Sequence, residues 1–137
     1  MQREVVVTPK SWSPRGEAAL QGQGRQLLIW SGIPGETARV RIVHEGEHQD
    51  YAVFRDTRRP DPHRIAPVCD RYHTCGGCPL MHLDEGGQAY ARRQMVQAAL
   101  HDEGLGEVPV GNLVASPDGR QDFRHVLKLG VGFSDMG

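Results

Sequence analysis

The sequence lacks the features of membrane and secreted proteins. Its longest apolar run, Leu27–Trp30, is far too short to cross a membrane, and the first residues lack the basic and apolar regions of a signal peptide. The formal net charge is only -1, so no global positive field attracts nucleic acid. We therefore expect a soluble cytoplasmic protein with no membrane partner, in which any contact with nucleic acid is local.

Aromatic residues are also scarce. Aromatic residues make up only 6% of the chain, whereas it contains 17 glycines and 9 prolines. This composition favours turns and argues against an all-helical bundle. At 137 residues, the chain is short for an enzyme that carries its own cofactor domain. The composition thus predicts one domain or two small modules.

Five short stretches in residues 1–66 have the composition or alternation of β-strands. They are 4–8, 17–21, 25–30, 37–43 and 50–56. Within 37–43, small and branched apolar residues alternate with Arg39 and Arg41, so one face of the strand is apolar and the other basic. Five short strands in this length predict a closed, OB-like barrel.

Positive charge is concentrated in the same segment. Residues 1–66 hold ten Arg and Lys against eight Asp and Glu, whereas residues 67–137 hold six against nine. Nearly all the basic residues of the first segment are arginines, whose planar guanidinium suits phosphate and base stacking. Interleaved aromatics could stack on bases, or they could fill the small core. We predict RNA contacts from the barrel and the basic, proline-containing connector after it, through Arg39, Arg41, Arg55, Arg58 and Arg59.

The only three cysteines of the chain lie within ten residues. They are Cys69, Cys75 and Cys78. An odd, clustered set does not suit a disulfide scaffold, and this spacing is typical of metal or cluster ligands. His82 could complete a Cys3His zinc site, and His73 could compete with it. A catalytic thiol activated by a neighbouring cation is a weaker alternative.

A helix is predicted after the cysteines. Asp84 can cap its start and Gly104 can end it after about residue 102. Its apolar stripe would comprise Ala89, Val96, Ala99 and Leu100. The fold class is therefore mainly β with one helix: a five-stranded OB-like barrel over 1–66, then a small metal-binding α+β segment over 67–104. Residues 105–137 contain one further candidate strand, Val126–Phe133, without a partner strand.

These features resemble, in the same order, the RNA (uracil-5-)-methyltransferases of the bacterial 23S rRNA type. Residues 69–83, which read C-D-R-Y-H-T-C-G-G-C-P-L-M-H-L, are similar to the iron–sulfur motif of that family. The barrel, with its turn at residues 33–36, is similar to the RNA-binding TRAM domain. Residues 88–100 resemble the helix after the cluster, and residues 123–131 the start of the central domain.

The resemblance implies a [4Fe-4S] cluster held by Cys69, Cys75 and Cys78, with a fourth cysteine that this chain does not contain. It also implies a separate S-adenosylmethionine domain, whose cysteine nucleophile and glutamate base act on a uridine exposed in structured rRNA or tRNA, with no DNA partner. We therefore expect the amino-terminal RNA-binding and iron–sulfur portion of such an enzyme, truncated in its central domain (105–137) and inactive alone. The alternative is a stand-alone RNA-binding module with a structural Cys3His zinc.

Overall fold

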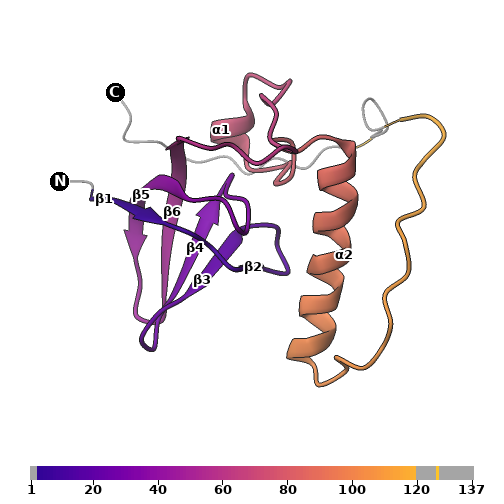
Figure 1. Ribbon diagram of the computed structural model, residues 1–137, viewed down its shortest axis with the longest axis horizontal. Helices are drawn as coiled ribbons and strands as arrows, with labels where there is room; N and C mark the ends of the chain where they lie inside the picture. Colours follow the sequence, from indigo (N-terminus) through magenta and orange to yellow (C-terminus); the bar gives the residue numbers. More distant parts are fainter. Residues whose placement is uncertain (1–2, 120–125, 127–137) are drawn as a thin grey trace.

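A computed structural model of the chain describes residues 3–119 and Val126. In Figure 1 a curved β-sheet occupies one side of the molecule and one long helix stands beside it. A short helical turn lies above the sheet, and an extended segment runs back along the long helix. The mainly β fold class is therefore confirmed.

The sheet has six strands. They are β1 (Glu4–Val7), β2 (Ser11–Trp12), β3 (Ala18–Gln21), β4 (Gln26–Trp30), β5 (Ala38–Glu45) and β6 (Gln49–Thr57). Their order across the sheet is β1-β5-β6-β4-β3-β2. The β4–β6 pair is parallel and the other pairs are antiparallel. Residues distant in sequence, such as Trp30 and Val53, therefore become neighbours in the sheet.

In the described residues β1 and β2 are the two edges of an open sheet, so the sheet is barrel-like and not the closed barrel that the sequence predicted; we refer to β1–β6 below as the barrel. The expected count of five strands is also too low by one. Each predicted stretch coincides with a strand, and the additional strand is β2. Two residues are too few to show the alternation that marks a strand in sequence. β2 exists because Ser11 and Trp12 pair with Ala19 and Ala18 of β3, and this pairing is a tertiary contact.

One apolar core lies inside the curved sheet. It consists of Ala18, Ile29, Ala38, Val40, Ile42 and Ala52. Along β5 the alternation is as predicted, because Val40 and Ile42 are buried while Arg39 is exposed. The outer face of β5 thus presents arginine side chains, as the sequence indicates.

The described residues form two helices where one was expected. The long helix α2 (Glu85–Asp102) is the predicted one, and the Asp84 side chain accepts a hydrogen bond of 2.8 Å from the Gly87 amide at its start. Gly104 follows its end with a φ of +75°, a conformation that glycine adopts without strain. The second helix, α1 (Tyr72–Cys75), is a single turn of four residues inside the cysteine motif. One turn is too short to show helical periodicity in a sequence.

The predicted apolar stripe of α2 is wrong. The structure buries Gly87 and Ala91, and Met95 packs against the same core, whereas Val96 is half exposed. These buried positions are four residues apart, so they share one face of the helix. They pack against a second apolar cluster made of Trp12, Ile33, Leu80 and Leu83. Small residues occupy this face because α2 approaches its neighbours closely: a Cβ at Gly87 would lie 2.8 Å from a His63 side-chain carbon.

Residues 105–119 form turns and extended chain beside α2. The Gln97 side chain of α2 donates a hydrogen bond to the Gly106 carbonyl in this segment. Apart from Val126, the strand predicted at Val126–Phe133 lies outside the described residues. Neither described helix combines the length and the apolar character that membrane crossing requires.

Candidate nucleic-acid interface and cysteine loop

The three cysteines lie on one exposed loop, residues 69–78, which we call the cysteine loop. All three thiols are free and exposed to solvent. Cys75 ends α1, and Gly76 follows with a φ of +68°, so the chain turns sharply toward Cys78. A side chain at Gly77 would lie only 3.4 Å from the Cys75 sulfur. Gly76 thus allows the turn between Cys75 and Cys78 without backbone strain.

The donor set of this loop suits a soft metal or an iron–sulfur cluster, since exposed thiols can ionise and bind such metals. In the described part of the chain, however, no three His, Cys, Asp or Glu side chains lie close enough to hold a metal ion together. The residues thus fit by their chemistry and by their place on one loop. Binding would require the three thiols to move toward one another.

His82 is buried beneath this loop rather than exposed beside the thiols. Its Nε2 donates a hydrogen bond of 3.0 Å to the Gly32 carbonyl, and its Nδ1 accepts one of 2.8 Å from the Tyr72 hydroxyl. Burial lowers the pKa of His82 to about 4, so the ring is neutral. Both ring nitrogens are engaged, which leaves neither for a metal. The alternative of His82 as the fourth ligand is therefore not supported by this structure.

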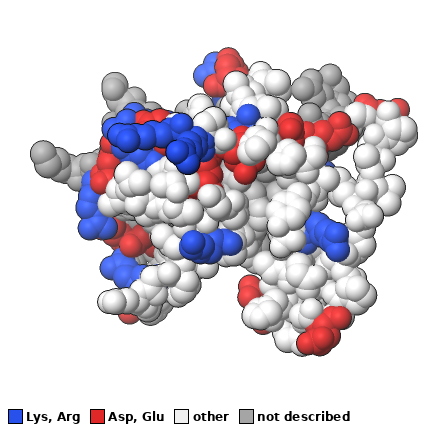
Figure 2. Space-filling view, viewed as in Figure 1, with Lys and Arg blue, Asp and Glu red and all other residues white. Residues whose placement is uncertain are grey.

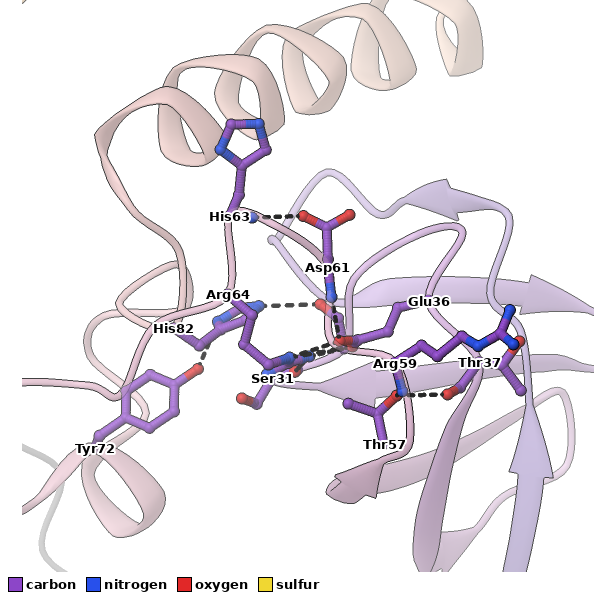
Figure 3. Close-up of polar contacts among 11 residues, drawn as sticks. Ser31, Glu36, Thr37, Thr57, Arg59, Asp61, His63, Arg64, Tyr72 and His82 are labelled. Atoms are coloured by element: carbon purple, nitrogen blue, oxygen red, sulfur yellow. Dashed lines mark hydrogen bonds and ion pairs between the residues drawn. The ribbon is translucent and has the colours of Figure 1, made fainter.

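Arg64 joins the connector to the barrel. Its Nε donates a hydrogen bond of 2.8 Å to Glu36, and its Nη2 donates one of 2.9 Å to the Ser31 carbonyl (Figure 3). The guanidinium carbon lies 3.9 Å from the centre of the Phe54 ring, where a cation–π contact is favourable. The Glu36 side chain is fully buried and that of Arg64 is only 12% exposed. Arg64 follows Arg58 and Arg59 in the same connector, but unlike them it is a structural residue.

The rest of the connector is folded against the same site. The Asp61 amide donates to Glu36 at 3.0 Å, and the Ile65 amide donates to the His82 carbonyl at 2.9 Å. Figure 3 shows Glu36, Asp61, Arg64 and His82 close together between the strands and the segment that leads to the cysteines. The connector thus holds the cysteine loop against the barrel instead of separating the two.

Two of the five predicted RNA-binding arginines are already paired with carboxylates. Arg39 pairs with Asp56 and with Glu4, and Arg55 pairs with Glu4 at 3.7 Å. The hydrogen bond to Asp56 raises the pKa of Arg39, and that bond lowers the pKa of Asp56. These acids neutralise part of the basic face.

The other three arginines, Arg41, Arg58 and Arg59, form no ion pair with any residue that the structure describes. Arg58 and Arg59 line a hollow of about 890 Å³ where β5 begins and β6 ends, together with Thr37, Thr57 and the paired Arg39 and Asp56. In Figure 2 the Lys and Arg side chains gather at this end of the barrel, with acidic side chains among them. Arg41 lies further along β5, and its Nε is buried without a hydrogen-bond partner in the described chain. The free positive charge of the predicted set therefore rests on these three residues.

The aromatic residues mostly fill the structure. Trp12 is buried in the second core, and Phe54 lies under Arg64. Trp30 packs against Tyr72, and Tyr51 packs against His44. Of the two interpretations of these aromatics, core filling describes them better than a stacking platform for bases.

No model of a known protein family matches the chain. Curated relatives do. The chain is 30% identical over 115 residues to the 23S rRNA (uracil(1939)-C(5))-methyltransferase RlmD of Aeromonas salmonicida. The aligned residues cover 84% of this chain and 26% of the relative. It is 33% identical over 113 residues to the protein of the same name from Stenotrophomonas maltophilia, covering 82% of this chain and 25% of the relative. By sequence, the chain belongs to the RNA (uracil-5-)-methyltransferase family.

The RlmD protein of Shewanella baltica is 36% identical over 87 residues, which cover 64% of this chain and 18% of the relative. Across these relatives of the RNA (uracil-5-)-methyltransferase family, the chain spans about a quarter of their length or less. The barrel, connector and cysteine loop therefore correspond to one part of these relatives.

Proposed function

We propose that this chain is the RNA-binding and iron–sulfur portion of an S-adenosylmethionine-dependent RNA uracil-C5-methyltransferase. The observation that carries the proposal is the direct attachment of a loop with three free thiols to a barrel with unpaired arginines, in a chain related to 23S rRNA methyltransferases. Residues 1–66 would act as a TRAM-like RNA-binding barrel, and residues 67–104 as the cluster-binding segment. The residues that bind S-adenosylmethionine and transfer the methyl group would lie in other parts of the enzyme.

The barrel would bind RNA through the hollow where β5 begins and β6 ends. Arg58 and Arg59 are exposed there and carry charge that no carboxylate of the described chain neutralises. Arg41 would extend this surface along β5, whereas Arg39 and Arg55 would contribute less because Glu4 and Asp56 compete for them. Arginine forks suit phosphates, so the contacts would position an exposed RNA segment without reading its sequence. Ribosomal RNA is the substrate named for the relatives, and tRNA is an alternative.

The cysteine loop would hold a [4Fe-4S] cluster through Cys69, Cys75 and Cys78. Their clustering on one exposed loop supports this donor set, and the fourth iron would require a ligand from elsewhere. When bound, the cluster would supply a rigid junction between the barrel and the following helix. The Tyr72, His82 and Arg64 side chains already connect this junction to the barrel.

Replacing Arg58 and Arg59 together by alanine should weaken binding of a single-stranded, uridine-containing RNA by about tenfold at low salt, because two phosphate contacts are lost. The slope of log affinity against log salt should also become shallower by about one to two. Fluorescence anisotropy titrations of a labelled RNA oligonucleotide over a series of salt concentrations would measure both quantities.

The matched control for this variant is the pair Arg92→Ala and Arg93→Ala, two exposed arginines on α2. This control removes the same charge from another surface, so a general loss of positive charge would affect both variants equally. Equal losses of affinity would show that the hollow is not the binding site. RNA affinity of the unchanged protein that does not depend on salt would contradict phosphate binding altogether.

A further inference from the structure

The cysteine loop has a single anchor. All residues from 69 to 78 are described, and Tyr72 is the only one of them that is buried. The loop contains one helical turn, α1, whose N-cap residue Arg71 makes no side-chain capping hydrogen bond. A helix of this length is not stable in isolation. The position of the loop therefore depends on what Tyr72 contacts.

Tyr72 reaches the barrel in two ways. Its ring packs against Trp30 at the end of β4, with ring centres 5.7 Å apart. Its hydroxyl donates a hydrogen bond to His82, which in turn donates one to the Gly32 carbonyl just after β4. A continuous chain of contacts thus runs from α1 through a neutral histidine to the barrel backbone (Figure 3).

The place of Tyr72 in the motif links this anchor to the thiols. Tyr72 is the third residue after Cys69 and the third before Cys75, which ends α1. Fixing Tyr72 therefore restricts the backbone on both sides of it at once. A loop held in this way loses less conformational entropy when its three thiols close around a metal.

We propose that Tyr72 is a positioning residue for the metal site, and that its hydrogen bond to His82 strengthens metal binding by the three cysteines. The inference rests on the proposed function, since it takes these thiols as metal ligands. Coupling between two sites is reciprocal in free energy. If contact with the barrel through Tyr72 raises metal affinity, metal binding stabilises the folded barrel through the same residue. Tyr72 itself contributes no ligand.

Tyr72→Phe is the most direct test, because it keeps the ring and removes only the hydroxyl. The full chain and the variant would be reconstituted anaerobically with iron and sulfide, and loss of the cluster to a chelator would be followed by visible absorbance. We expect loss to be several-fold faster in the variant. Titration with cobalt(II) alone, read by its thiolate charge-transfer absorption, should show correspondingly weaker binding. Tyr90→Phe, on the exposed face of α2, is the control and should behave like the unchanged protein.

His82→Gln provides a second variant. A glutamine amide can donate to the Gly32 carbonyl and accept from the Tyr72 hydroxyl, so metal retention should remain close to that of the unchanged protein. His82→Leu, which can do neither, should lose metal as fast as Tyr72→Phe does. Equal retention in His82→Leu and His82→Gln would contradict a role for the hydrogen-bonded chain.

The rise in melting temperature on metal loading separates positioning from simple structural support. If Tyr72 positions the loop, this rise should be smaller in Tyr72→Phe than in the unchanged protein. If Tyr72 only supports the fold, the loaded and metal-free proteins should both melt lower by the same amount, with unchanged metal retention, and the inference would be wrong. An unchanged protein that binds neither iron nor cobalt better than a variant with all three cysteines replaced by serine would instead overturn the proposed cluster site, and this inference with it.

Discussion

Glu36→Gln should lower the free energy of unfolding by about 3 kcal/mol or more, because it leaves the Arg64 guanidinium buried without its counter-charge. The Glu36 side chain is completely buried and accepts hydrogen bonds from Arg64 and from the Asp61 amide. Glutamine has nearly the same size as glutamate, so the loss of stability would come from the missing charge and not from altered packing. Urea unfolding followed by far-ultraviolet circular dichroism would measure it.

Two further variants test this explanation. Combining Glu36→Gln with Arg64→Met removes both charges and keeps an apolar side chain over Phe54, so part of the lost stability should return. Arg39→Ala breaks an exposed ion pair with Asp56 and should cost less than about 1 kcal/mol. If Glu36→Gln proved no more damaging than Arg39→Ala, the Glu36–Arg64 pair would not be what holds the connector on the barrel.

The protein should also lose stability as the pH falls from about 6.5 toward 4, because folding lowers the pKa of His82 from 6.5 to about 4. In this window the unfolded chain binds a proton that the folded chain excludes, so acid favours unfolding. Burial is the main cause of the lowered pKa, and the nearby charges of Arg64 and Glu36 act in opposite directions. The shift corresponds to about 3 kcal/mol of stability that is present above pH 6.5 and lost by pH 4.

Stability curves over this pH range should separate His82 from the other titrating groups. His82→Gln removes the ionisable ring, so its free energy of unfolding should fall less steeply between pH 6.5 and 4. His48→Gln, at an exposed position, should follow the unchanged protein. Parallel curves for the unchanged protein and His82→Gln would mean that His82 is not the group that resists protonation.

Local patterns predicted much of the fold. Composition or alternation indicated the segments that became β1, β3, β4 and β6, and alternation indicated β5, whose Val40 and Ile42 face the core. Asp84 and Gly104 marked the ends of α2 because capping depends on neighbouring backbone groups. The spacing of the cysteines indicated metal or cluster ligands; all three are exposed on one loop, but they do not form a metal-holding group in the described residues, so the cluster stays a prediction.

Contacts between residues far apart in sequence could not be predicted, because no local pattern marks them. Glu36 and Arg64 are 28 residues apart, and nothing local distinguishes Arg64 from the exposed arginines beside it. Arg39 loses its free charge only because the β5–β6 register places it opposite Asp56. Tyr72 did leave a signal, as an aromatic residue among polar ones inside the cysteine motif. Its partner Trp30 became apparent only with the fold.

Chemical analysis of iron and acid-labile sulfide in the full chain is the most direct test of the proposed iron–sulfur site. The protein would be reconstituted anaerobically with iron, sulfide and a small thiol that can supply the missing fourth ligand. We expect a brown protein with about four irons and four sulfides per chain, and none in a variant with Cys69, Cys75 and Cys78 replaced by serine. A colourless protein that holds one zinc and no sulfide would contradict the iron–sulfur assignment.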